Sequence, residues 1–358
     1  MKNIVILATG GTIAGAGEQG KDIGYKSGSI KAQTLIDAIP ELKNVANICV
    51  EQFCNINSDD VTSEIWIALA KRIQELLQRE NVDGIVIMHG TDTMEETAFF
   101  LSLVLGGSAP SAAGNVAKPV IMTGSMRPAT AAEPDGPANL FFAVKSAVDL
   151  CGRSAQESLD STCHAREGGH HLLVNAENTA GVYVAFAGKL MNARSVQKIH
   201  ANDLDAFAEL SCPPEPVLSE VEGSGHLPLV NAKNSFDISN LRELPRVSVL
   251  YFNADADAEL VRFAAERSAG LVIAGAGAGE FSQAWADAIA DVISKNKIPV
   301  VISTRINRGR IVPEQLLVSG TIAAYDLPPA KAAVLLRLAL TVTTDSAKIQ
   351  EMFEISFT

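Results

Sequence analysis

Short runs of β-branched and aliphatic residues that end in glycine, threonine or serine constrain the fold of this 358-residue chain more than any other feature. Three of them are Ile4–Ala8, Gly84–Met88 and Pro119–Met122, and each leads directly into a polar cluster. Such runs are typical of buried parallel strands, because a strand covered by helices on both faces has no alternating polar face. The sequence therefore predicts an open sheet built from βαβ units.

The longer stretches between these runs have the spacing of amphipathic helices. In Ser63–Arg79 a single apolar stripe lies opposite the charges and contains Ile65, Leu69, Ile73, Leu76 and Leu77. The second half of the chain repeats the alternation. It predicts strands at Val247–Tyr251, Gly270–Ala274 and Pro299–Ser303, and helices near Ala258–Arg267, Gln283–Lys295 and Pro329–Leu340.

We therefore predict an α/β protein of two domains. The larger N-terminal domain, expected over residues 1–205, has an open sheet with flanking helices. The smaller C-terminal domain, expected over residues 236–358, has a parallel sheet, and residues 206–235 form the linker.

Two segments, 152–180 and 211–235, lack clear periodicity and are polar or rich in glycine and proline. They also resemble each other, because His171–Asn178 parallels His226–Asn234. Both are longer than a usual connection, and we interpret them as surface insertions.

Composition excludes several classes of partner. The formal net charge of −12 repels phosphate backbones and no basic stripe offsets it, so nucleic acid is excluded. No apolar run reaches membrane-spanning length, since Arg337 interrupts the longest one. The apolar run at the N-terminus is too short for a signal peptide, so we expect a cytoplasmic protein, or a periplasmic one if a leader was removed.

Cysteine and histidine spacing gives no reason to expect a metal. The five cysteines contain no CxxC pair. Cys163, His164, His170 and His171 lie close together in the sequence, but their spacing matches no zinc pattern. We expect neither a metal nor any other cofactor.

The first polar cluster, Thr9–Gly15, places paired glycines and a hydroxyl residue directly after a predicted strand. Its sequence TGGTIAG has neither the dinucleotide spacing G-x-G-x-x-G nor the Gly-Lys-Ser/Thr of a P-loop. A plain strand–turn and a turn that presents a nucleophilic threonine are equally good interpretations of these residues alone.

The second cluster, His89–Thr97, follows another predicted strand with the sequence HGTDTMEET. Thr93 and Glu96 fit a helix capping box. Capping does not account for Thr91 and Asp92, which precede the cap. Because reactive groups collect where parallel strands end, we expect these residues, Thr9–Thr12 and Ser125–Arg127 to meet at one edge of the sheet.

Together the two clusters resemble the paired signatures of the bacterial L-asparaginases, including the asparaginase–glutaminases. The motif TGGTIAG is most similar to that of the exported, type II-like members. The resemblance continues through GSMRP at Gly124–Pro128, DGPANL at Asp135–Leu140, FDISNLRELP at Phe236–Pro245 and a closing helix at Ala347–Phe353. Apart from the two predicted insertions, it covers nearly the whole chain.

The resemblance implies roles for individual residues. Thr12 matches the nucleophile, and Tyr25 matches a tyrosine of a flexible lid. Thr91, Asp92 and Lys198 match a second cluster that supplies a base. Taken alone, Tyr25 reads as a surface aromatic residue and Lys198 as a surface lysine.

The same resemblance implies a substrate-binding set. Ser58 matches the ligand of the substrate carboxylate, and Asp59 follows it, where an acid favours the substrate ammonium group. We expect backbone N–H groups at the turns that contain Gly11 and Gly90 to stabilise the oxyanion. Glu280 lies where relatives shape tolerance for glutamine, and Glu314 is the candidate for an acid supplied by a neighbouring subunit, although a solvated loop acid is an equal alternative.

The predicted activity is hydrolysis of L-asparagine to L-aspartate and ammonia through an acyl-enzyme on Thr12, with L-glutamine as the alternative substrate. A catalytically impaired protein that binds aspartate or asparagine is a second alternative. The resemblance also implies a homotetramer, assembled as a dimer of dimers.

Overall fold

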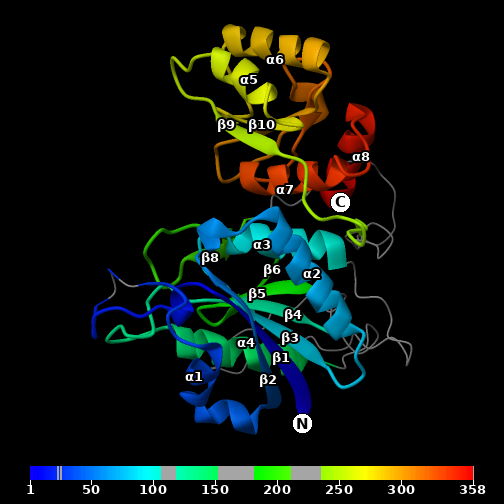
Figure 1. Cartoon of the computed structure of the whole chain (residues 1–358). Helices are drawn as coiled ribbons and strands as arrows, with labels where there is room; N and C mark the ends of the chain where they lie inside the picture. The colour runs from blue at the N-terminus through cyan, green and yellow to red at the C-terminus, as the bar shows by residue number, and fades with distance from the viewer. Residues whose placement is uncertain (22–23, 25, 106–117, 152–180, 211–234, 358) are drawn as a thin grey trace, which may run out of the picture. The chain divides into compact units, whose positions relative to one another are not determined.

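The computed structural model describes residues 1–21, 24, 26–105, 118–151, 181–210 and 235–357. The chain divides into two compact units (Figure 1). Among the described residues, the first unit contains Met1–Glu209 and 235–241, and the second contains Leu210 and the residues from Arg242 onward. Both predicted insertions, except Ser235, lie outside the described residues. The domain bounds inferred from the sequence therefore stay a prediction.

The first unit contains a six-stranded sheet with the order β2-β1-β3-β4-β5-β6. Neighbouring strands are parallel from β2 to β5, and β6 pairs antiparallel with β5. The strands are β1 (Lys2–Gly10), β2 (Ala46–Ile56), β3 (Gly84–Met88), β4 (Val120–Thr123), β5 (Val182–Phe186) and β6 (Lys189–Asn192). A separate antiparallel pair is formed by β7 (Val196–Lys198) and β8 (Phe207–Glu209).

Helices cover both faces of this sheet (Figure 1), with α2 and α3 on one side and α4 on the other. The helices are α1 (Ala32–Asp37), α2 (Ser63–Leu77), α3 (Met94–Leu105) and α4 (Gly136–Leu150). The hydroxyl of Thr62 caps α2 by accepting the N–H of Ile65 at 3.4 Å. Trp66 stacks on Phe100 with ring centroids 5.2 Å apart and joins α2 to α3.

The three apolar runs predicted as strands in this half are confirmed as β1, β3 and β4. The predicted helix is confirmed as α2, with Leu69, Ile73 and Leu76 buried and Ile65 and Leu77 half-buried. The strand β2 was not predicted, because it is an edge strand that pairs only with β1, and its residues after Ala46 are half-buried or exposed. The hairpin of β5 and β6 was not predicted either.

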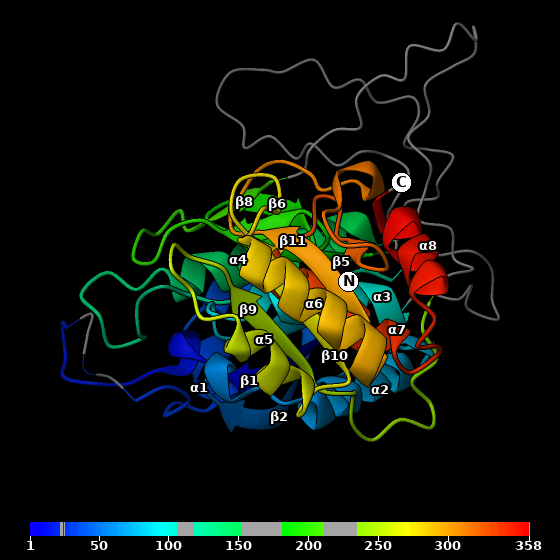
Figure 2. The same cartoon turned by 90° about the horizontal axis from the view of Figure 1, so that it is seen from above.

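The second unit contains a parallel four-stranded sheet with the order β12-β11-β10-β9. Figure 2 shows α5 and α6 lying across β9 and β10, and α7 packs on the sheet from the other face. The elements are β9 (Val247–Tyr251), α5 (Glu259–Ala265), β10 (Gly270–Gly275), α6 (Gln283–Asn296), β11 (Val300–Thr304), β12 (Ile322–Ala323), α7 (Pro329–Ala339) and α8 (Ser346–Phe357). The predicted strands and helices of this half are confirmed, with bounds that shift by one or two residues.

Trp285 lies at the centre of this second core and is fully buried. Its indole N–H donates to the carbonyl of Ala256 at 2.9 Å, and its ring meets Phe252 edge-on at 5.3 Å. The indole polar group is therefore satisfied inside an apolar core. Across the part of the chain that the structure describes, no helix has the length and apolar character needed to span a bilayer.

We predict that Ile87→Ala destabilises the first unit far more than Ile48→Ala. Ile87 is fully buried on the central strand β3, so its truncation leaves a cavity and costs ~2–5 kcal/mol. Ile48 is half-buried on the edge strand β2, where ~1 kcal/mol is expected. Urea denaturation in a Trp285→Phe background measures this, because Trp66 is then the only tryptophan. Equal losses for the two variants would contradict the assignment of the core.

Candidate active site at the carboxyl edge of the first sheet

The turns that follow β1 and β3 lie in direct contact. The two strands are parallel neighbours, paired up to Ala8 and Met88, so both chains leave the sheet at the same edge. A Cβ atom built on Gly11 would lie 2.5 Å from the backbone nitrogen of Gly90. Gly11 also has a φ of +80°, which L side chains rarely adopt. Glycine at this position therefore lets the Thr12 turn and the Thr91 turn touch.

The chain after β2 joins the same edge. A Cβ atom on Gly90 would lie 2.7 Å from the hydroxyl of Ser58, which is itself buried. The hydroxyl of Thr93 donates to the carbonyl of Ser58 at 2.7 Å. Asp59 follows Ser58 in a short 3-10 helix, η3 (Ser58–Asp60), and is exposed. The segments around Gly11, Ser58 and Gly90 thus pack against one another at the carboxyl edge of the sheet.

Thr12 opens a second 3-10 helix, η1 (Thr12–Ala14), and is half-buried. The N–H of Gly15 donates to the carbonyl of Thr12 at 2.7 Å, which closes the turn. The N–H of Gly11 donates to the carbonyl of Ile56 at 3.0 Å. This bond holds the turn against β2, and the role of the turn's N–H groups in stabilising an oxyanion stays a prediction.

Lys198, at the end of β7, reaches the Thr91 turn from far along the chain. Its ammonium group donates to the hydroxyl of Thr91 at 2.9 Å and to the carboxylate of Asp92 at 2.6 Å. The lysine side chain is 15% exposed and that of Asp92 is 69% exposed. The structure thus brings together the three residues that the resemblance grouped, with the lysine largely shielded and the carboxylate open to solvent.

The turn after β4 lies behind the Thr91 turn, as the sheet edge predicts. A Cβ atom on Gly124 would lie 2.4 Å from the carbonyl oxygen of His89. Asp135 accepts the backbone N–H groups of Met126 and Arg127, each at 2.9 Å. Asn139 donates to the carbonyl of Gly124 at 3.0 Å. These partly buried hydrogen bonds hold the turn that follows β4. The sequence indicated Asp135 and Asn139 only as part of the motif DGPANL.

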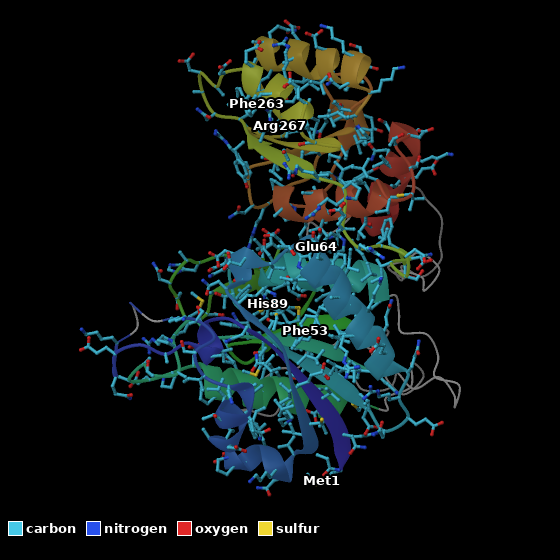
Figure 3. The ribbon with its side chains drawn as sticks, in the orientation of Figure 1. Met1, Phe53, Glu64, His89, Phe263 and Arg267 are labelled. Carbon is cyan, nitrogen blue, oxygen red and sulfur yellow. The ribbon has the colours of Figure 1, made fainter. Side chains whose placement is uncertain are left out.

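His89, labelled in Figure 3, lies inside the first unit and is 1% exposed. Its Nδ1 must donate to the carbonyl of Gly90 at 2.7 Å, since a carbonyl only accepts. Its Nε2 then accepts from the hydroxyl of Thr97 at 3.2 Å, and that hydroxyl accepts from the indole N–H of Trp66 at 2.8 Å. This chain of hydrogen bonds supports the backbone directly before Thr91.

Burial lowers the pKa of His89 from 6.5 to about 4, against the smaller opposing effect of its hydrogen bond to Gly90. The imidazole is therefore neutral near pH 7, which the hydrogen-bond chain also requires. No site role was predicted for His89, since a histidine before a glycine turn is a weak signal. Only the partner groups on α2 and α3 reveal its place in the structure.

Three further expected site residues lie beyond the described part of the first unit. Tyr25 lies outside the described residues. Glu280 and Glu314 belong to the second unit, where both are exposed. Glu280 closes a small loop through its N–H, which donates to the carbonyl of Ala276 at 2.7 Å, and Glu314 lies in η4 (Pro313–Gln315). Their roles stay predictions.

The described residues contain no group of three or more histidine, cysteine or acidic side chains placed to hold a metal ion. The sequence cluster of Cys163, His164, His170 and His171 lies outside the part that the structure describes.

We predict that His89→Gln removes an acid-sensitive part of the folding stability. The folded-state pKa of His89 is depressed, so protonation favours the unfolded chain, and stability is lost as the pH falls from 6.5 towards about 4. Between about pH 7.5 and pH 5, the wild type should lose ~2 kcal/mol more than the variant. Urea denaturation at both pH values measures the difference. The variant should also be less stable near neutral pH, and parallel losses on acidification would refute the assignment.

Comparison with known proteins gives a single family for both units. The family model described as "Asparaginase, N-terminal" matches residues 3–159 and 170–226. The model described as "Glutaminase/Asparaginase C-terminal domain" matches residues 246–353. The N-terminal match is interrupted only between residues 159 and 170, so family correspondence continues through most of the first predicted insertion.

Individual relatives match over nearly the full length. The chain is 38% identical to "L-asparaginase 2" of Bacillus subtilis (strain 168), with 99% of this chain and 86% of that protein covered. It is 33% identical to the "Glutaminase-asparaginase" of Pseudomonas fluorescens biotype A, covering 99% of this chain and 90% of the relative. A crystal structure of a "Probable Cytoplasmic L-asparaginase" from Campylobacter jejuni is 36% identical, covers 99% of both chains and superimposes with a TM-score of 0.79.

Proposed function

The chain belongs to the asparaginase family of amidohydrolases, and from that premise we propose that it hydrolyses the side-chain amide of L-asparagine with Thr12 as the nucleophile. The observation that carries the proposal is the Lys198 ammonium group held between Thr91 and Asp92, directly behind the contact of Gly11 with Gly90. This arrangement supplies a hydroxyl, a proton relay and a carboxylate within one sheet edge.

The reaction is an acyl transfer in two steps. The Thr12 oxygen attacks the amide carbon and passes its proton to a base, and the amide nitrogen takes up a proton and leaves as ammonia. Water then attacks the resulting ester, which releases L-aspartate and restores the Thr12 hydroxyl. A threonine hydroxyl is too weak an acid to attack unaided, so the mechanism needs a neighbouring base. We assign the relay to Thr91 and Lys198, with Tyr25 assisting Thr12.

Asp92 links that relay to the substrate. Its carboxylate accepts a hydrogen bond from the Lys198 ammonium group at 2.6 Å. Asp92 is also the exposed member of the pair, so it is the group that an entering α-ammonium group meets first. A substrate bound there competes with Lys198 for the carboxylate, so Asp92 links substrate binding to the hydrogen bond between Lys198 and Thr91.

The rest of the set recognises the amino-acid end of the substrate. We assign the substrate carboxylate to Ser58 and the ammonium group to Asp59 together with Asp92. Because the Gly11 N–H is taken by Ile56, we assign oxyanion stabilisation to the N–H groups of the Gly90–Asp92 turn. The backbone of Gly11 then shapes the wall of the site without donating to the oxyanion. No cofactor is part of this proposal.

The proposal extends to assembly and compartment. We propose a homotetramer built as a dimer of dimers, in which Glu314 of a neighbouring subunit completes the site. We also propose a cytoplasmic location, with a periplasmic one as the alternative. Sedimentation velocity of wild type and Glu314→Ala tests the assembly, and cell fractionation tests the compartment.

Thr12→Ala should lower ammonia release from L-asparagine by about 10³-fold or more, because the variant has no oxygen to form the ester. Thr12→Ser keeps a hydroxyl and should retain measurable turnover. Coupled ammonia assays on purified protein measure both rates, with thermal unfolding as the check that each variant is folded. Full turnover in a folded Thr12→Ala protein would refute the nucleophile assignment.

L-Asparagine should be preferred over L-glutamine by about 10- to 200-fold in kcat/KM, since one additional methylene is worth ~1–3 kcal/mol of discrimination. Glu280→Ser should reduce that preference if Glu280 restricts the longer side chain. Comparable rates on both amides in the wild type would favour a glutaminase-asparaginase. No ammonia from either amide, with L-aspartate still raising the melting temperature, would identify the binding protein instead.

A further inference from the structure

The segment from Thr91 to Glu95 binds Lys198 both at its backbone N–H and at its side-chain ammonium group. The side-chain ammonium group donates to Thr91 and Asp92 at 2.9 and 2.6 Å. The backbone N–H of the same lysine donates to the carboxylate of Glu95, in the first turn of α3. One short stretch of chain therefore fixes where this residue starts and where its charged end lies.

The strand that carries Lys198 needs such an anchor. The pair of β7 and β8 is only three residues long on each side and lies outside the six-stranded sheet. Two short strands alone are marginal, because they bury little surface and make few hydrogen bonds. Phe207 of β8 packs on Phe186 of β5 with ring centroids 4.9 Å apart, which holds β8 against the sheet. The backbone N–H of Lys198 donates to the carboxylate of Glu95, so this bond ties the end of β7 to the start of α3.

Glu95 is suited to be that anchor. A carboxylate in the first turn of a helix is favoured by the helix dipole, which stabilises negative charge there. A hydrogen bond from a backbone N–H to an ionised carboxylate is about twice as strong as a neutral one. Glu95 is half-buried, so its bond to Lys198 competes with less water than an exposed acid would face.

We propose that Glu95 is a positioning residue for the amide hydrolysis: it fixes the backbone of Lys198 and thereby sets the distance from the ammonium group to Thr91. Glu95 does not touch the substrate in this proposal. Its effect passes entirely through the lysine, and the inference rests on the function proposed above. An error of about 1 Å in the position of a catalytic group costs on the order of 10²-fold in rate.

The experiment compares two substitutions at Glu95. Glu95→Met has a side chain of similar length and good helix propensity, but it removes the acceptor. Glu95→Gln keeps an oxygen that accepts the Lys198 N–H. We expect Glu95→Met to lower kcat for L-asparagine by about 10- to 100-fold with KM changed by less than about threefold, and Glu95→Gln to stay within about fivefold of wild type.

Glu259→Met is the matched control. Glu259 is also an acid in the first turn of a helix, α5, and it pairs with Arg262 on the surface. This variant loses the same charge in the first turn of a helix and should keep wild-type kcat. Loss of activity in Glu259→Met would mean that the helix dipole alone explains the result at Glu95.

A second readout does not depend on turnover. Reductive methylation with ¹³C-formaldehyde gives each lysine an NMR signal, and Lys198→Arg identifies the signal of Lys198. Glu95→Met should shift or broaden that signal while Glu95→Gln leaves it unchanged. If wild type releases no ammonia, the proposed function fails, yet this signal still tests the anchor.

Several outcomes overturn the inference. An unchanged Lys198 signal and unchanged kcat in Glu95→Met would show that Lys198 needs no anchor. Equal loss in Glu95→Met and Glu95→Gln would show that the charge of Glu95, not its hydrogen bond, is what matters. If Glu95→Met does not fold, Glu95→Gln together with Glu95→Ser decides the question by the same comparison.

Discussion

The contact between Gly11 and Gly90 is the constraint on which the site depends. Parallel pairing of β1 with β3 delivers both turns to one edge, but only the absence of side chains lets the two backbones meet. Gly90 in turn packs on Ser58, so the three segments form one layer with no room for a methyl group at either glycine. The Thr12 turn and the Thr91 turn become neighbours as a result of this backbone packing.

The ion pair at this edge of the sheet positions the Lys198 side chain more than it stabilises the fold. The ion pair of Lys198 with Asp92 has a carboxylate that is mostly open to water, so its contribution to folding is at most ~1 kcal/mol. The exposed carboxylate of Asp92 is instead available to a charged substrate, which can replace Lys198 as its partner. The buried polar groups have the opposite character. His89 and Thr97 are satisfied by fixed partners and shielded from solvent, and they hold the Gly90 backbone without changing charge near pH 7.

The sequence predicted the edge of the sheet well, because β-branched runs followed by polar clusters have a direct geometric meaning in a parallel sheet. Thr12 and Thr91 were located by that rule alone. Lys198 was located only by resemblance, since nothing local distinguishes it from other lysines, and nothing in the sequence singled out its partner Glu95. The edge strand β2 was missed for a related reason: its residues after Ala46 are half-buried or exposed, and pairing on one side leaves no continuous apolar run.

These differences follow the physical range of each interaction. Strand patterning and helix capping depend on residues a few positions apart, so a sequence displays them. The bonds of Lys198 to Thr91 and of Trp66 to Thr97 join residues that are 107 and 31 positions apart. Both pairs end in the segment that leads into α3 and forms its first turn, where Thr91, Asp92, Glu95 and Thr97 contact different neighbours. A helix that begins at the carboxyl edge of a sheet is therefore the natural place to collect a site, because its first residues face the ends of several strands while its last turns remain in the core.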